Sequence, residues 1–336
     1  MSRAAQARRI ATAAAYGGGG LGLLTAASWG LLFGEAKLAR RWVGPPDAAP
    51  PAADGTYGHG TSGPPLTLAV LGDSSAAGLG VQDPLETPGV LVAAGLAEVA
   101  DRRVRLVSAA VVGARSEHLA SQVEQTRAER PDVAVIMVGT NDVTGLVRPA
   151  EAIAHLARAV RRLGADGVEV VVGTCPDLGT IEPIAQPLRW LARLWSRQLA
   201  AAQTIAVVEA GGRSVSLGDI LGPEFEARPR ELFSADRFHP SAAGYAAAAA
   251  ITLPSVCAAL GVWPEEADAE VDRRLFVPDG VRPVAAAAVR AAAHPGSEVT
   301  GARVDGRERG PRGRWAFLRR RRPRAVTERV DVRQGA

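Results

Sequence analysis

Three polar residues have the types and spacing needed for acyl transfer through a serine nucleophile. Ser74 lies in the stretch LTLAVLGDSSAAGLG, while Asp236 and His239 are three residues apart in FSADRFHPSAAGY. A serine hydroxyl is a poor nucleophile until a positioned base takes its proton. A carboxylate bonded to the other imidazole nitrogen holds the correct tautomer of a histidine base and stabilises its protonated form. We therefore expect Ser74 as nucleophile, His239 as base and Asp236 as the orienting carboxylate.

The tetrahedral intermediate of acyl transfer also needs hydrogen-bond donors for its oxyanion. The expected donors are the backbone N–H of Ser74, the backbone N–H of Gly113 in VVGARS and the side-chain amide of Asn141 in GTND. Loss of one such donor commonly costs about 3 to 4 kcal/mol of barrier. Glycine at position 113 leaves no side chain in the path of the approaching oxygen. These three groups are predicted to form an oxyanion hole.

The elements that must position these residues alternate between strand and helix. Short β-branched runs that are apolar on both faces predict strands of a covered parallel sheet. These strands begin at Leu66, Val104, Val133, Val168 and Thr204. Amphipathic or alanine-rich stretches predict helices that begin at Ser116, Ala150 and Ser241. The alternation indicates an α/β fold, a three-layer α/β/α sandwich with a central parallel five-stranded sheet.

In an open parallel sheet the ligand crevice lies outside the carboxyl ends of the strands. Taken singly, Ser74 fits a helix cap and Gly113 fits a turn. Asn141 could bond its own turn, and Asp236 with His239 could cap a surface loop. The combination favours catalysis, because nucleophile, donors, orienter and base fall on loops at one predicted edge. None of the other four histidines follows a predicted strand: His59, His118, His155 and His294.

These motifs resemble the sequence blocks of the GDSL or SGNH hydrolases. The similar blocks are GDSS from Gly72, the loop glycine Gly113, GTND from Gly139 and DRFHP from Asp236, and the resemblance covers residues 66–261. It implies a flavodoxin-like sandwich of the SGNH hydrolase type. Members of the family are mostly esterases, lipases, thioesterases and carbohydrate deacetylases, and some transfer acyl groups instead of hydrolysing them.

The resemblance also implies the role of each site residue. It assigns the nucleophile, the two further oxyanion donors and the base to Ser74, Gly113, Asn141 and His239, with Asp236 completing the triad. Two features depart from the family pattern. Ser75 stands where the GDSL signature has leucine, and SAAVVGARS lacks the asparagine that often precedes the second-block glycine.

The N-terminal region has the pattern of a membrane anchor. A basic segment, residues 1–9, precedes residues 10–34, which carry no charge. As a helix these 25 residues would span roughly 37 Å, enough for a hydrocarbon core of about 30 Å. A cleaved signal sequence and a glycine-rich disordered leader are the alternatives. We expect a single-pass anchor in the cell membrane with the catalytic domain outside the cytoplasm, similar to envelope-associated members in actinobacteria.

The rest of the chain divides by composition. Residues 35–65 are rich in proline and glycine and are expected to form a linker before a hydrolase domain at 66–263. Residues 264–336 have too few large apolar residues for a core and are expected to be a disordered tail, either solvated or lying on an anionic membrane. Residues 303–336 carry twelve arginines against four acidic residues, whereas the whole chain has a net charge of +4. The basic character therefore belongs to the tail, and we expect no nucleic-acid partner.

Cysteine usage excludes a disulfide scaffold. Cys175 and Cys257 are the two cysteines of the chain and lack CxxC spacing, so we expect no metal site and no cofactor. One bridge between them is an open alternative.

The sequence therefore predicts a membrane-tethered serine ester hydrolase that acts through an acyl-enzyme on Ser74. The alternatives are an acyltransferase that moves the acyl group to a sugar or alcohol with the same triad, and a non-catalytic binding protein. A small-molecule, lipid or glycan ester is the expected substrate. The apolar stretch 177–195 is interpreted either as a flap beside the crevice or, for Trp190 and Trp195, as helix core.

Overall fold

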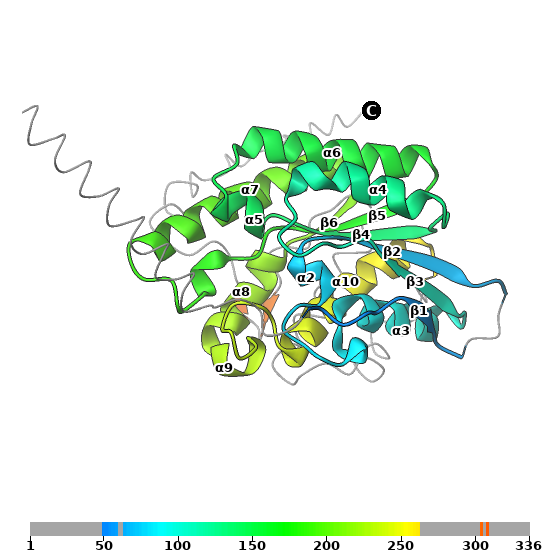
Figure 1. Cartoon of the computed structure of the whole chain (residues 1–336), viewed down its shortest axis with the longest axis horizontal. Coiled ribbons are helices and arrows are strands. Elements are labelled where there is room, and N and C mark those ends of the chain that lie inside the picture. Colours follow the sequence, from blue (N-terminus) through cyan, green and yellow to red (C-terminus); the bar gives the residue numbers. More distant parts are fainter. Residues whose placement is uncertain (1–48, 60–62, 263–302, 305–306, 309–336) are drawn as a thin grey trace, which may run out of the picture.

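The computed structural model describes residues 49–59, 63–262, 303–304 and 307–308, and it has the layered α/β architecture expected from the sequence (Figure 1). The spatial order of the central sheet is β1-β3-β2-β4-β5-β6. Its strands are β1 (Gly55–Tyr57), β2 (Leu66–Gly72), β3 (Val104–Ser108), β4 (Val133–Met137), β5 (Glu169–Gly173) and β6 (Arg213–Val215). Strands β2 to β6 run parallel, and β1 pairs antiparallel with β3. The parallel strands have the order of a flavodoxin-like sheet, and β1 adds a sixth strand at the edge.

Both faces of the sheet are buried, because successive strand side chains point to opposite sides. In β2, Leu68 and Val70 belong to one hydrophobic core, while Ala69 and Leu71 belong to the other. This explains why the strand sequences are continuously apolar and do not alternate with polar residues.

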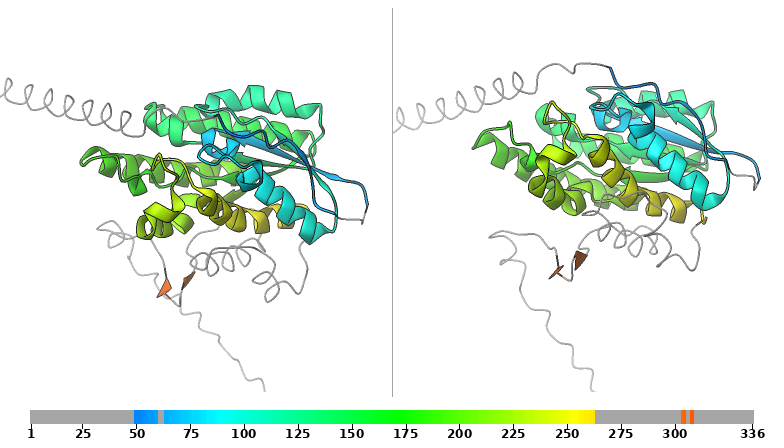
Figure 2. Two further views of the ribbon diagram at one scale, coloured as in Figure 1. Left: turned by 60° about the horizontal axis from the view of Figure 1, so that its bottom comes forward. Right: turned by 90° about the horizontal axis from the view of Figure 1, so that it is seen from below.

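Helices cover the two faces (Figures 1 and 2). On one side lie α3 (Pro88–Ala100), α8 (Leu217–Ala227), α9 (Pro229–Leu232) and α10 (Ala242–Ala259). On the other lie α4 (Leu119–Arg127), α6 (Pro149–Ala165) and α7 (Leu188–Glu209). Short helical turns follow the strands, namely α2 (Ser74–Ala77), η1 (Pro84–Glu86), η2 (Ser116–His118), α5 (Thr140–Thr144) and η3 (Leu178–Thr180). The two-residue strands β7 (Arg303–Val304) and β8 (Arg307–Glu308) form a separate antiparallel pair.

The alanine-rich helix α10 begins after Ser241, whose side chain accepts a hydrogen bond from the Gly244 N–H. Within the part of the chain that the structure describes, α10 is the one helix long and apolar enough to cross a membrane. In the structure 72% of it is buried, with α3 as a packing partner. Core packing therefore accounts for its apolar composition.

The strand predicted at residues 204–210 is wrong. These residues form the end of α7, and the fifth parallel strand is β6, a few residues later. In this segment Val207 is fully buried, whereas Ile205 is 60% exposed and Val208 is 37% exposed. A helix exposes one face in this way, whereas a central strand of this sheet buries both. The helix ends before Gly211, whose φ is +90°.

The expected linker at 35–65 includes part of the folded domain. Residues 55–57 form β1, and the Asp54 carboxylate accepts a hydrogen bond of 2.7 Å from the Ser108 N–H. The expected anchor at 10–34 and most of the expected tail at 264–336 lie outside the described residues. Cys175 and Cys257 are buried free thiols, so the alternative of a bridge between them is excluded.

Candidate active site

Ser74, His239 and Asp236 lie in a hydrogen-bonded series at the carboxyl edge of the sheet. The Ser74 Oγ is 3.1 Å from the His239 Nε2, and the His239 Nδ1 is 2.6 Å from an Asp236 carboxylate oxygen. Ser74 is 7% exposed and His239 is 8% exposed, so bulk water screens the series weakly. The structure thus brings together two segments that are 165 residues apart.

The local sequence explains why Ser74 is presented at the end of β2. Gly72 has φ +135°, and a Cβ there would lie 1.8 Å from the Met137 carbonyl oxygen, so only glycine fits. Asp73 then caps the short helix α2, its carboxylate accepting a bond of 2.9 Å from the Ser75 N–H. Ser74 is the first residue of α2, where a backbone N–H has no partner within the helix. Both the hydroxyl and the backbone N–H of Ser74 are therefore available to interact with a substrate.

Asp236 is held in a dense set of hydrogen bonds. Its carboxylate accepts from the Ser234 hydroxyl, from the Phe238 and His239 N–H groups and from the His239 ring. Burial raises the pKa of Asp236, but the hydrogen bonds from the His239 ring and from these other donors outweigh burial and lower that pKa to about 2. The carboxylate is consequently ionised at any pH where a histidine can act as a base.

The expected oxyanion donors surround the same edge. Gly113 has φ +82°, and a Cβ there would meet nothing within 4 Å, so the backbone conformation and not a lack of space is what favours glycine. Among the described residues, the Ser74 and Gly113 N–H groups have no hydrogen-bond acceptor. The Asn141 amide donates one hydrogen to the Ala114 carbonyl at 3.0 Å, which leaves the second hydrogen of its amide for a ligand.

A buried carboxylate holds the loop that carries Gly113. Asp142 is 1% exposed and accepts from both the N–H and the hydroxyl of Ser116, the latter at 2.9 Å. Burial raises the pKa of Asp142, and the two bonds from Ser116 oppose that rise. Asp142 and Asn141 therefore both connect the Gly113 loop to α5. The family often has an asparagine shortly before the glycine at position 113, and this chain lacks it.

Two buried glutamines that the sequence did not identify fix the strand ends. Gln122 donates to the Gly72 carbonyl at 2.9 Å and accepts from the Gly72 N–H at 2.7 Å, two residues before Ser74. Gln203 likewise accepts from the Cys175 N–H and donates to the Val138 carbonyl. Gln122 lies between Leu119 and Thr126 on the buried face of α4. A polar residue in phase with the apolar residues of a helix was therefore the sequence signal that could have identified it.

Asp73 is a buried carboxyl beside the series. It is 2% exposed, and burial raises its pKa to about 6 against the bonds donated by Ser75 and the attraction of His239. Its pKa therefore lies far above that of Asp236, although both are aspartates of one site.

Burial also raises the pKa of Cys175 well above its ordinary value, so this thiol is not the nucleophile of the site.

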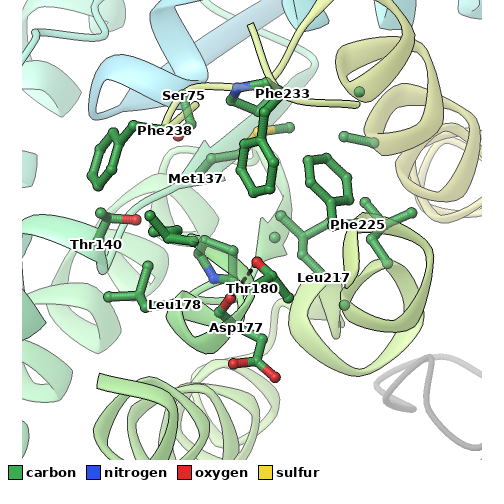
Figure 3. Close-up of a pocket in the computed structure, with 18 of the residues that line it drawn as sticks. Ser75, Met137, Thr140, Asp177, Leu178, Thr180, Leu217, Phe225, Phe233 and Phe238 are labelled. Atoms are coloured by element: carbon green, nitrogen blue, oxygen red, sulfur yellow. Dashed lines mark hydrogen bonds between the residues drawn. The ribbon is translucent and has the colours of Figure 1, made fainter. Parts of the chain in front are cut away.

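A cavity of about 90 Å³ lies next to Ser74 (Figure 3). Asp73 and Ser75, the two neighbours of Ser74, line it, as does Phe238, whose ring meets the His239 ring edge-on with centroids 4.9 Å apart. Figure 3 shows Phe225 and Phe233 side by side at the wall, and their rings form a T-shaped pair with centroids 4.9 Å apart. Most of the lining is apolar.

The segment 177–195 divides between the cavity and the surface. Residues 177, 178, 180 and 181 line the cavity, in agreement with the interpretation of a segment beside the crevice. The alternative that Trp190 and Trp195 are helix core is wrong, because they are 58% and 36% exposed on α7. Within the described residues, no group of three or more His, Cys, Asp or Glu side chains is arranged to hold a metal ion.

A serine hydroxyl, an imidazole and an ionised carboxylate in this order form the site of a serine hydrolase. The GDSL-like Lipase/Acylhydrolase family matches residues 70–247 of the chain. The GDSL-like esterase Rv1075c of Mycobacterium tuberculosis is 46% identical over 252 residues, which cover 71% of this chain and 79% of that protein. The chain belongs to the GDSL-like lipase/acylhydrolase family, and it is an ester-hydrolysing enzyme.

Three solved structures are similar to this chain at low sequence identity. TesA is 23% identical with a TM-score of 0.42, covering 53% of this chain and 91% of its own. A catalytic mutant of Axe2, an acetylxylan esterase from Geobacillus stearothermophilus, is 21% identical with a TM-score of 0.43, covering 55% and 90%. LAE5, an alpha/beta hydrolase enzyme from the metagenome of Lake Arreo, is 21% identical with a TM-score of 0.47, covering 60% and 98%.

Proposed function

We propose that the protein hydrolyses esters of short acyl groups through a covalent acyl-enzyme on Ser74, and that it does so while tethered to a membrane by residues 10–34. The observation that carries the proposal is the pair of distances around His239. One ring nitrogen lies 3.1 Å from the serine oxygen and the other lies 2.6 Å from a carboxylate. An imidazole held between these two groups can accept the serine proton without first reorienting.

In the first half of the reaction, the Ser74 Oγ bonds to the ester carbonyl carbon and its proton passes to the His239 Nε2. The carbonyl oxygen becomes an oxyanion, which the Ser74 and Gly113 N–H groups and the Asn141 amide stabilise. When the tetrahedral intermediate collapses, the ester C–O bond breaks and the imidazolium gives its proton to the departing alkoxide. Asp236 stays ionised throughout and stabilises the imidazolium.

In the second half, water replaces the alcohol. It attacks the carbonyl carbon of the acyl-enzyme while the His239 Nε2 takes one of its protons. Collapse of this second intermediate breaks the bond to the Ser74 Oγ, returns the proton to that oxygen and releases the carboxylic acid. The named relative is an esterase, and no observation on the described residues favours transfer to a sugar or alcohol acceptor.

The cavity beside Ser74 is proposed to receive the acyl group. An apolar cavity of about 150 Å³ in another protein holds a six-carbon ring, so ~90 Å³ suits a chain of about four carbons. A sugar or a lipid alcohol is too large for this space, so the acyl side of the ester is the part that fits. The Phe225 and Phe233 rings line the cavity and would limit the chain length.

Membrane tethering rests on the uncharged length of residues 10–34, which are followed by the basic residues Lys37, Arg40 and Arg41. The catalytic domain is proposed to lie outside the cytoplasm. Substrates would then be short acyl esters carried by a lipid or a glycan near the membrane.

A fluorophosphonate probe tests the nucleophile. The wild-type chain is expected to be labelled at Ser74, and Ser74→Ala is expected to lose the label. Ser75→Ala is the matched control, because it removes the adjacent hydroxyl and keeps the proposed nucleophile. Labelling that persists in Ser74→Ala, or that is lost only in Ser75→Ala, would contradict the proposal.

A further inference from the structure

Exposed apolar side chains gather at the catalytic edge of the fold. Eight large hydrophobic residues are exposed within the described part of the chain, and six of them follow the carboxyl ends of the parallel strands. We name these six the apolar rim: Leu85, Val111, Val112, Leu146, Trp190 and Trp195. They come from η1, from the loop before η2, from the loop between α5 and α6, and from the first turns of α7. In Figure 1, α5 and the beginning of α7 lie to the left of the sheet.

The rim side chains are aliphatic or aromatic, and large fractions of them are exposed. Leu85 is 60% exposed, Leu146 is 61% exposed and Trp190 is 58% exposed. The other two exposed hydrophobics, Ile205 and Val208, lie in the last turns of α7, toward the opposite edge. Exposed apolar side chains concentrated on the loops of one edge are a candidate interaction surface.

The loops at the opposite edge have a different composition. The segments 101–103 and 128–132, which lead into β3 and β4, read DRR and AERPD and expose no large apolar side chain among the described residues. The two edges of one domain therefore differ, and the apolar one is the edge that holds Ser74.

The chain enters the domain at this same edge. Pro50 and Pro51, at the start of the described chain, line one hollow together with Ala76 and Ala77 of α2 and with Ala110 after β3. Residues 35–48 separate this point from the uncharged segment 10–34, and fourteen residues span at most ~48 Å when fully extended. The diameter of a domain of this size is of similar length. Because the chain enters the domain at the catalytic edge, a linker of this reach lets that edge contact the bilayer.

We propose that the apolar rim lies in the interface of the bilayer that holds the tether, so that the catalytic edge faces the membrane. This rests on the tethering in the proposed function. Indole rings with an exposed apolar body prefer the headgroup level of a bilayer. Charges of both signs stand beside the rim residues: Glu86, Glu117 and Glu182, and Arg115, Arg148 and Arg189. Because these charges balance, insertion is driven by apolar area and not by attraction to anionic lipid.

Site-directed fluorescence on the full chain tests this placement. Single cysteines are introduced at Leu85 or Leu146 in the rim, at Ile205 as the control and at Ser28 in the uncharged segment, and each is labelled with an environment-sensitive fluorophore. Ile205 is a matched control because it is 60% exposed, as the rim leucines are, but lies near the other edge. The native thiols at Cys175 and Cys257 are buried, so they do not take the label in the folded protein. The chain is then reconstituted in phosphatidylcholine vesicles with and without lipids that carry a nitroxide quencher.

The expected result is quenching of the labels at Leu85, Leu146 and Ser28 at least twofold stronger than at Ile205, with no dependence on salt. Quenching at Ser28 with equal, weak quenching at Leu85, Leu146 and Ile205 would overturn the rim placement and leave the tether intact. Absence of quenching at Ser28 and at the rim together would overturn both. Rim labels that are shielded without any vesicle, together with cross-linking between chains, would assign the rim to a second copy and overturn the membrane placement.

Discussion

Replacing Asp73 by asparagine should stabilise the protein at alkaline pH, because it removes a charge from a buried site. Asp73 is 2% exposed, and burial raises its pKa from 3.8 to about 6. An acid whose pKa is higher in the folded state holds its proton more tightly there. Folding is therefore favoured at low pH, and this contribution is lost as the pH rises from about 4 to about 6. Asparagine retains a side-chain oxygen that can accept the Ser75 N–H bond.

The magnitude follows from the two pKa values. A difference of about two pKa units corresponds to about 3 kcal/mol between the protonation states. At pH 8 the variant should therefore exceed the wild type in free energy of unfolding by about 3 kcal/mol, and at pH 4 by less than about 1 kcal/mol.

Urea denaturation of the full chain in a mild detergent measures this difference, with tryptophan fluorescence as the signal. The wild type and Asp73→Asn are compared at pH 4 and at pH 8, and Asp83→Asn serves as the control, since Asp83 caps η1 at the surface. A difference between wild type and Asp73→Asn that does not change with pH would refute the reasoning. A less stable Asp73→Asn at pH 8 would refute it as well.

Three further predictions concern activity. Asp236→Asn should lower kcat by roughly 10³ to 10⁴, because the neutral amide no longer stabilises the imidazolium, and an unchanged kcat in steady-state assays of p-nitrophenyl butyrate would contradict this. Asn141→Ala should lower kcat by about 10² to 10³ with little change in KM, because its amide acts on the oxyanion, and an effect on KM alone would assign it to ground-state binding. Phe225→Leu should move the preferred acyl chain of p-nitrophenyl esters from about four carbons toward six or eight, because it opens the cavity wall, and an unchanged chain-length profile would exclude the cavity as the acyl site.

The parallel sheet could be predicted from sequence because its strands have a strong local signal. The run from Leu66 to Gly72 is buried on both faces. A short, continuous apolar run of this kind is typical of a strand in a parallel sheet that is covered on both sides. The strand predicted at Thr204 failed because a short apolar run also suits the end of a long helix. The three residues of β1 had no local signal, since their strand exists only through pairing with β3.

That Ser74, Asp236 and His239 lie together could be predicted from the sequence, whereas the residues that hold their surroundings in place could not. Ser74 and His239 are distinctive residues after predicted elements, so the edge rule for parallel sheets places them together. Gln122 and Asp142 act through hydrogen bonds to Gly72 and Ser116, across 50 and 26 residues of sequence. Such pairings depend on how α4 packs against β2 and how α5 packs against α7, which no local pattern specifies.

The account depends most on the acyl-enzyme at Ser74, which rapid-quench mass spectrometry detects directly. Wild-type protein mixed with p-nitrophenyl butyrate and quenched in acid within milliseconds should carry one butyryl group, located by peptide mapping to the segment that holds Ser74. His239→Ala should show no such adduct on this timescale. Turnover of the ester without any adduct on Ser74, or an adduct that forms at the wild-type rate in His239→Ala, would contradict the mechanism.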